Sequence, residues 1–231
     1  MGMKNKKKVN QGEKVVRLFK FADLKASTEK READDGTAKE EKVLEGHASV
    51  FNQETDIGDY FREVIKPGAF DNADLTDVPL FVNHDSSRIP IARSRRNNGN
   101  STMTLSIDDV GLKIRATIDT EGNPEAAALY SAVQRGDITG MSFCFSVDKN
   151  EWDWTDEDHP KRTITAIKKV YEVSAVNFPA YDGTDISSRD KDALDNARKA
   201  MEFARSQDLE KSKLEKEKDV LKEKIKILGG M

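Results

Sequence analysis

The sequence predicts an α+β fold, in which a mainly antiparallel β-domain has flanking helices and is followed by a charged C-terminal helix. Between residues 43 and 186, short apolar runs alternate with turn residues, a pattern typical of strands. A helical pattern interrupts them at residues 124–135, and leucines at seven-residue spacing mark a long helix after about residue 188. With 231 residues, 35% of them charged and 36% hydrophobic, the chain can hold one ordinary domain plus solvated tails, or at most two small domains.

Residues 1–41 are polar and charged, which predicts a flexible N-terminal arm. Within this arm, residues 15–21 have the character of a strand that would add an edge to the sheet. The basic start, residues 1–8, is interpreted as a solubilising tail rather than as a binding element. The first buried structure is therefore expected from about residue 42.

Several segments of the central zone have the length and the alternation of strands. They are residues 44–51, the strand that runs into the Pro67-Gly68 turn, and residues 78–82, 102–107, 112–118, 140–147 and 163–176. The turn residues at 108–111 predict that two of these strands form a hairpin. The acidic segment 151–158 is expected to be a loop between the last two strands.

A helix is predicted at residues 124–135, since Pro124 suits a first turn and Gly136 suits the position after the last turn. Its apolar positions would cover part of the sheet.

The C-terminal helix is predicted over about residues 188–228. Leu214, Leu221 and Leu228 recur every seven residues, but Lys218 stands where the second apolar heptad position is wanted. The pattern therefore indicates a solvated helix that associates weakly, or only within an assembly, rather than a strong coiled coil.

Composition excludes several function classes. The formal net charge of −4, with both signs interspersed, argues against a nucleic-acid-binding surface. No apolar run approaches the length of a membrane span or follows the basic start as in a signal peptide, so we expect a cytosolic protein. One cysteine and three histidines argue against a multi-cysteine or histidine-rich metal site, and no cofactor is expected. Hydrolytic chemistry would have to come from a nucleophile and a base.

Of the three histidines, His84 is the best candidate for a general base. It follows a compact apolar strand, where a strand end would hold it rigidly. His47 lies within the alternating pattern of a strand, and His159 precedes a proline in an acidic loop. A structural role for a lone histidine such as His84 remains the alternative.

Ser142 is the candidate nucleophile. Met141, Phe143 and Phe145 alternate to one face of the predicted strand and leave Ser142 and Cys144 on the other. The alternative is that the small residues only make room for packing.

Glu172 is the candidate third member of a triad, because an acid in an apolar strand should be paired or have a perturbed pKa. An outward-facing residue without such a role is the alternative.

Read together, several segments resemble phage prohead proteases of the HK97 type, which are relatives of the herpesvirus assemblins. The three main segments are Asn83-His84-Asp85, Gly140-Met141-Ser142-Phe143-Cys144-Phe145, and Tyr171-Glu172-Val173-Ser174-Ala175-Val176-Asn177-Phe178-Pro179-Ala180-Tyr181. Residues 46–51, 65–70 and 111–112 are also similar to that family. The resemblance spans roughly residues 43–187, and its strength lies in the order and spacing of the segments.

The resemblance implies Ser142 as nucleophile, His84 as general base and Glu172 in place of the second histidine of the herpesvirus relatives. Asp85 is also available as the third residue. Cys144 is not read as the nucleophile, because it lies two residues beyond the matching serine. The implied fold is a herpesvirus-protease-like sheet or barrel.

The resemblance further implies a serine endopeptidase that processes scaffold, the N-terminal segment of the coat protein and itself inside the procapsid, in the bacterial host cytoplasm. Its partners would be the major capsid protein, the scaffold and further copies of itself. Residues 42–187 would form the protease domain, and residues 188–231 a helical tail that could act as a scaffold or packaging segment. The first rival is a non-catalytic internal scaffold protein with the same fold, and the second is a β-rich binding module.

Overall fold

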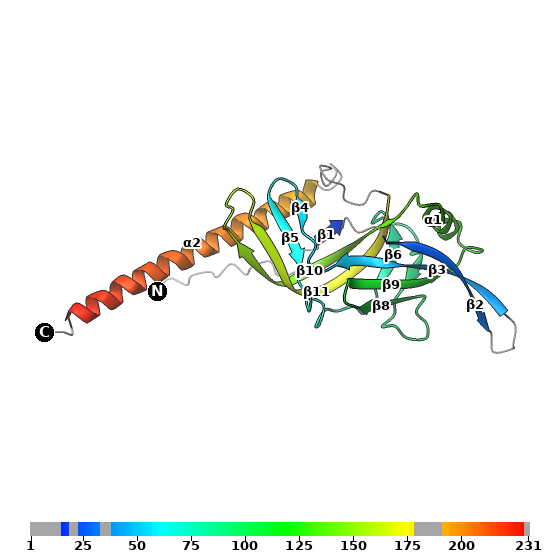
Figure 1. Cartoon of the computed structure of the whole chain (residues 1–231), viewed down its shortest axis with the longest axis horizontal. Coiled ribbons are helices and arrows are strands. Elements are labelled where there is room, and N and C mark those ends of the chain that lie inside the picture. The colour runs from blue at the N-terminus through cyan, green and yellow to red at the C-terminus, as the bar shows by residue number, and fades with distance from the viewer. Residues whose placement is uncertain (1–14, 19–22, 33–37, 178–190, 229–231) are drawn as a thin grey trace.

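A computed structural model of the chain describes residues 15–18, 23–32, 38–177 and 191–228. It contains two β-sheets, one short helix and one long helix (Figure 1). The elements in chain order are β1 Val15–Leu18, β2 Lys25–Glu32, β3 Ala38–Val50, β4 Thr55–Ile57, β5 Phe61–Ile65, β6 Pro79–Val82, β7 Ala92–Arg93, β8 Met103–Ile107, β9 Gly111–Ile118, α1 Pro124–Arg135, β10 Gly140–Asp153, β11 Lys161–Val176 and α2 Lys191–Leu228. Neither of the helices described is long and apolar enough to span a membrane.

The larger sheet has seven strands in the order β1-β10-β11-β5-β4, with β6 beside β11 and β7 beside β6. Its centre is the long antiparallel pair β10–β11, while β5 and β6 both pair with β11 in parallel. The smaller sheet has the order β2-β3-β9-β8 and is antiparallel throughout. The α+β class expected from the sequence is therefore confirmed, with some parallel pairing in the larger sheet.

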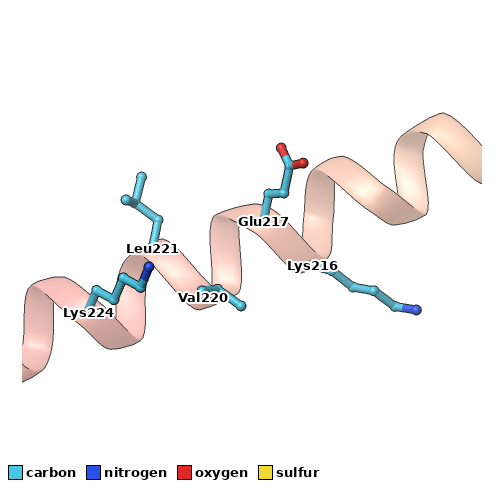
Figure 2. Close-up of a pocket in the computed structure, with 5 residues that line it drawn as sticks. All are labelled: Lys216, Glu217, Val220, Leu221 and Lys224. Atoms are coloured by element: carbon cyan, nitrogen blue, oxygen red, sulfur yellow. The ribbon is translucent and has the colours of Figure 1, made fainter.

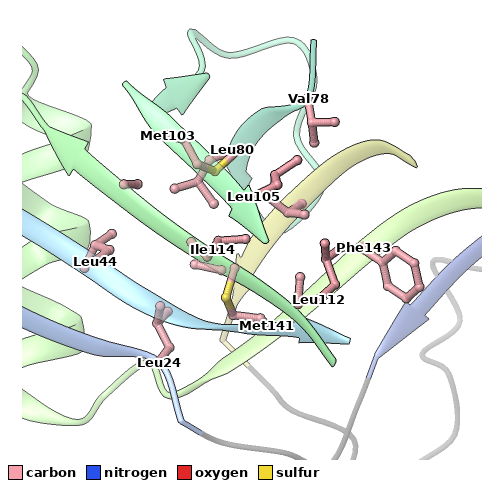
Figure 3. Close-up of a cluster of buried hydrophobic side chains, with 14 of the residues drawn as sticks. Leu24, Leu44, Val78, Leu80, Met103, Leu105, Leu112, Ile114, Met141 and Phe143 are labelled. Carbon is pink, nitrogen blue, oxygen red and sulfur yellow. The ribbon is translucent and has the colours of Figure 1, made fainter. Parts of the chain in front are cut away.

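The core lies between the two sheets. Figure 3 shows Leu44, Leu112 and Ile114 from the smaller sheet facing Met141 and Phe143 from β10, and each of these side chains is at most 1% exposed. The alternation on β10 is the one expected from the sequence, since Phe143 and Phe145 stack at a centroid distance of 4.3 Å inside the core. Burying such side chains supplies most of the stability of a domain of this kind.

Helix α1 has the limits that its sequence predicts. The side chain of Asn123 accepts hydrogen bonds from the backbone N–H groups of Glu125 and Ala126 at 3.0 and 3.3 Å, which caps the first turn. Gly136 ends the helix in the left-handed conformation with φ of 79°. The hairpin β8–β9 is also confirmed. Its Gly111 is required, because a Cβ there would lie 2.0 Å from the carbonyl oxygen of Ser49.

Two boundaries differ from the sequence expectation. Residues 25–32 and 38–41, grouped by composition with the N-terminal arm, lie in strands β2 and β3. Strand β10 continues past residue 147 to Asp153, because β11 runs beside it over that length and pairs Trp152 with Arg162. Both stretches are largely exposed to solvent, so their sequences lack the alternation of apolar and polar residues that predicts a strand.

Helix α2 contacts the β-domain through its N-terminal half, as far as Asp208, which accepts a hydrogen bond from Trp154. Ala197 and Met201 pack against Phe61 and Trp152, whereas Leu214 and Leu221 are 52% and 59% exposed. The rest of the helix extends away from the β-domain (Figure 1). In this extended part, Lys216, Glu217, Val220, Leu221 and Lys224 line a shallow hollow formed by the one helix (Figure 2). The predicted solvated helix is confirmed, and its self-association stays a prediction.

His47 ties β3 to two neighbouring segments. Its Nδ1 lies 2.6 Å from a carboxylate oxygen of Asp23, and its Nε2 lies 3.0 Å from one of Asp108. Burial lowers the pKa of His47, but the hydrogen bonds and negative charges of Asp23 and Asp108 raise it more. The net pKa is therefore above its ordinary value of 6.5.

We expect His47→Gln to lower the free energy of unfolding by about 1 kcal/mol near pH 6, and by less near about pH 8.5. A histidine whose folded-state pKa is raised contributes stability that is fully present below its unfolded pKa and is lost as the pH rises through the folded value. Urea unfolding of both proteins at the two pH values measures the difference, with the partly exposed His159→Gln as control. A destabilisation that does not change with pH would contradict the proposed charge on His47.

Candidate active site

Ser142 lies on the face of β10 that is turned away from the core phenylalanines. Its direct neighbour on β11 is Ser174, and the next pair along the same face is Cys144 with Glu172. Residues directly opposite each other on antiparallel strands have Cβ atoms about 5 Å apart. The strand pairing therefore brings Ser142 close to Ser174 and, one pair further along, Glu172. Ser142 and Ser174 are both fully buried.

His84 reaches this face from the end of β6. Because β6 runs parallel to β11, with Phe81 opposite Ser174, the chain leaves the sheet beside the same pair of serines. Asn83 and His84 both have positive φ, at 51° and 60°, so the chain turns sharply at the strand end. Two adjacent non-glycine residues in this conformation cost about 1–3 kcal/mol each, and such strain is typical of functional sites.

Glu172 holds His84 in place. One oxygen of the carboxylate, Oε1, lies 2.6 Å from His84 Nδ1. The other, Oε2, accepts a hydrogen bond of 2.7 Å from Ser174 Oγ. The side chains of His84 and Glu172 are 23% and 12% exposed, so the pair is shielded without being sealed from solvent.

Ser174 is the part of this network that the sequence analysis missed. While its hydroxyl donates to Glu172, its oxygen accepts the backbone N–H of His84 at 3.2 Å. Ser174 thus fixes both members of the pair. A serine in a buried strand is not distinctive by itself. Ser174 could have been found because it lies two residues from Glu172, so both side chains share one face of the strand.

The network determines the protonation of the imidazole. A carboxylate only accepts hydrogen bonds, so we assign the proton of neutral His84 to Nδ1. Nε2 then carries the lone pair that a general base needs. Nε2 is buried and has no hydrogen-bond partner among the described residues.

The structure brings His84 and Glu172 into contact, but the hydroxyl of Ser142 is engaged elsewhere. Ser142 Oγ donates a hydrogen bond of 2.7 Å to the backbone carbonyl of Arg17 in β1. The nucleophile predicted from the sequence therefore lies on the same face as the pair while its proton points to a neighbouring strand.

The alternative candidates lie in other environments. Asp85 turns back on its own loop, where its Oδ1 accepts from the backbone and the hydroxyl of Ser87 at 3.1 and 2.5 Å. His47 has a carboxylate at each ring nitrogen, and His159 is 31% exposed near Asp56. Cys144 is buried on the same face as Ser142, opposite Glu172.

A buried serine on β10, a carboxylate on β11 and a histidine just after β6 are the three kinds of group that serine hydrolases use. The family model described as caudovirus prohead serine protease matches residues 26–199, which is most of the 231-residue chain. The chain belongs to the caudovirus prohead serine protease family.

Two individual proteins are similar to this chain. The prohead protease of Enterobacteria phage HK97 is 33% identical over 149 residues, which cover 63% of this chain and 59% of the relative. This chain therefore matches less than two thirds of the length of that curated relative. The solved structure of the bacteriophage T4 capsid assembly protease matches 72% of this chain and 99% of its own, at 13% identity and a TM-score of 0.44.

Proposed function

We propose that this chain is a serine endopeptidase that processes capsid-assembly proteins during prohead maturation. Its substrates would be the scaffold or the N-terminal segment of the coat protein, and the chain itself. Membership of the prohead serine protease family supports the reaction class. The single observation that carries the assignment of residues is the contact of 2.6 Å between His84 Nδ1 and Glu172, which leaves Nε2 available to take a proton.

The mechanism follows from these groups. The hydroxyl of Ser142 exchanges its hydrogen bond with the Arg17 carbonyl for one with His84 Nε2, which takes the proton as Ser142 Oγ attacks a peptide carbonyl carbon. Glu172 keeps the proton on Nδ1 and stabilises the imidazolium that forms. His84 then protonates the leaving amine, and water, activated by the same nitrogen, releases the acyl group from Ser142.

The proposed domain layout follows the resemblance seen in the sequence. Residues 42–187 would form the protease domain with a herpesvirus-protease-like fold, together with strand β2 and the start of β3, which pair into its smaller sheet. Helix α2, within residues 188–231, would contact scaffold or coat subunits when the protease is packaged. The chain would act inside the procapsid, in the cytoplasm of the bacterial host.

A non-catalytic scaffold protein is the rival reading. His47, which has a structural role, has a carboxylate partner at both ring nitrogens. Among the described residues, His84 has a hydrogen-bond partner at Nδ1 and none at Nε2, which favours a catalytic role over a structural one.

We test the proposal by following the intact mass of the purified chain over time at high concentration. Discrete truncations in the wild type that are absent in His84→Ala would support a protease. His159→Ala, which alters a partly exposed histidine away from the cluster, serves as control. If neither the chain alone nor the chain co-expressed with its coat protein yields His84-dependent fragments, the scaffold reading is correct.

Ser174→Ala should lower kcat about tenfold and change KM by less than about twofold. The substitution removes a hydrogen bond to a charged carboxylate and an acceptor for the His84 backbone, and the loss of about 1.5 kcal/mol corresponds to roughly a tenfold change in rate. Ser174→Thr keeps the hydroxyl and should restore most of the activity. Steady-state kinetics on a cleaved peptide measure both constants, and an unchanged kcat would show that Ser174 does not position the pair.

A further inference from the structure

Strand β1 lies where an extended peptide would have to lie to reach Ser142. It forms the edge of the larger sheet and pairs antiparallel with β10, with Val16 opposite Cys144 and Leu18 opposite Ser142. Adding a strand to a sheet edge is a common way for proteins to bind peptides, because main-chain hydrogen bonds hold the segment. β1 also precedes the family-matching residues, which begin at residue 26. In these respects β1 resembles a bound peptide.

The carbonyl group that meets the nucleophile is that of Arg17. Ser142 Oγ donates its hydrogen bond of 2.7 Å to this oxygen, so the peptide bond beside the nucleophile joins Arg17 to Leu18. The hydroxyl contacts the oxygen through its proton and is not directed at the carbonyl carbon. Reaction requires the proton to move to His84 Nε2.

The side chain of Arg17 enters a buried acidic site. Its Nε and Nη2 donate to the two oxygens of Glu63, the second at 3.1 Å. The side chains of Arg17 and Glu63 are only 4% and 3% exposed. A guanidinium bound to a carboxylate through two parallel hydrogen bonds is both strong and geometrically selective, and lysine cannot reproduce it.

Glu63 does not need Arg17 for neutralisation. Arg162 Nη1 also donates to Glu63, at 3.1 Å. Burial raises the pKa of Glu63, but the charges of Arg17 and Arg162 lower it more, so the net pKa is below its ordinary value. Arg17 is therefore a second cation at one carboxylate, and the Glu63–Arg162 pair would stay balanced if β1 left.

We propose that Glu63 is a specificity-determining residue that selects arginine immediately before the scissile bond, and that β1 is bound as such a substrate strand. This inference rests on the proposed protease activity. Ser142 Oγ bonds to the arginine carbonyl carbon, the C–N bond to the next residue breaks, and His84 protonates the leaving amine. Water then releases the arginine carboxylate. Within the chain itself, the bond that is cut is Arg17–Leu18. Until β1 leaves the edge of the sheet, it competes with other substrates for the site.

The test uses the full chain with Arg17→Ala, which removes the Arg17 side chain from the acidic site and keeps the ion pair between Glu63 and Arg162. The probes are peptides Val-Val-Xaa with a fluorogenic leaving amine, where Xaa is arginine, lysine, glutamine or glutamate. We expect kcat/KM for arginine to exceed that for glutamine by about 100-fold or more, because other side chains leave the buried carboxylate with an unused binding position. Arg17→Ala should also cleave the arginine peptide about tenfold faster than wild type, because β1 without its arginine side chain is bound less tightly and is displaced more easily. Arg135→Ala, an exposed arginine of α1, is the matched control.

Glu63→Gln in the Arg17→Ala background should reduce the arginine preference below about tenfold, and urea unfolding checks that the variant is folded. If this variant does not fold, the test is the set of bonds that the wild type cuts in unfolded casein. The inference predicts that these bonds lie directly after arginine. Ser142-dependent cuts without arginine preference would overturn the inference and leave the proposed protease intact. No Ser142-dependent cleavage of casein or of any peptide would overturn both.

Discussion

Ser142→Ala should abolish proteolysis, with a fall in kcat of about 10,000-fold or more, while the protein remains folded. The expected loss is that large because alanine has no group that can form the acyl intermediate, and removing one member of a Ser-His-acid unit disables the whole unit. Folding should survive because, within the described part of the chain, the substitution removes one hydrogen bond, between Ser142 Oγ and the Arg17 carbonyl. Its loss is expected to cost about 1 kcal/mol of unfolding free energy.

The measurement is the rate of peptide cleavage and the intact mass of the chain over time, with urea unfolding to check the fold. Two substitutions on the same face of β10 provide matched controls. Ser146→Ala and Cys144→Ala alter buried residues of similar size at neighbouring positions and should keep cleavage within a few-fold of wild type. If Ser142→Ala cleaved normally and Cys144→Ala did not, the nucleophile would be the cysteine.

Local sequence patterns were sufficient to predict much of the fold. The side chains that alternate on β10 separate core phenylalanines from Ser142, and Asn123, Pro124 and Gly136 give α1 the limits that the sequence predicts. Strand β2 was missed because it is an edge strand whose exposed face carries charged side chains. Charges protect such edges from pairing with other chains, and they also remove the apolar alternation on which sequence prediction depends.

Local sequence patterns could not predict the parallel pairings of β5 and β6 with β11, because the paired strands are about 100 residues apart in the chain. These pairings place His84 beside Ser174 and Glu63 beside Arg162. The sequence could nominate His84, Ser142 and Glu172 separately, and it required the family resemblance to connect them. Arg17 and Glu63 were not nominated at all, although Glu63, like Glu172, is an acid in an apolar strand.

Glu172→Gln should lower kcat by about 100- to 10,000-fold and leave KM within about threefold of wild type. The amide is nearly isosteric, but it is neutral and cannot stabilise the imidazolium that the proposed mechanism forms on His84. It can also present its NH₂ group to Nδ1, which would favour the wrong tautomer of the ring. Substrate binding involves neither effect, so the loss should fall on kcat.

Asp85→Asn is the control that decides between the two acids considered for the third position. Asp85 binds Ser87 within its own loop, and its side chain makes no hydrogen bond to His84 in the part of the chain that the structure describes. We therefore expect Asp85→Asn to keep kcat within about twofold of wild type. Steady-state kinetics of both variants on one peptide, with unfolding curves to exclude misfolding, provide the comparison. A large loss in Asp85→Asn together with a small one in Glu172→Gln would assign the orienting role to Asp85 and would mean that the loop rearranges when substrate binds.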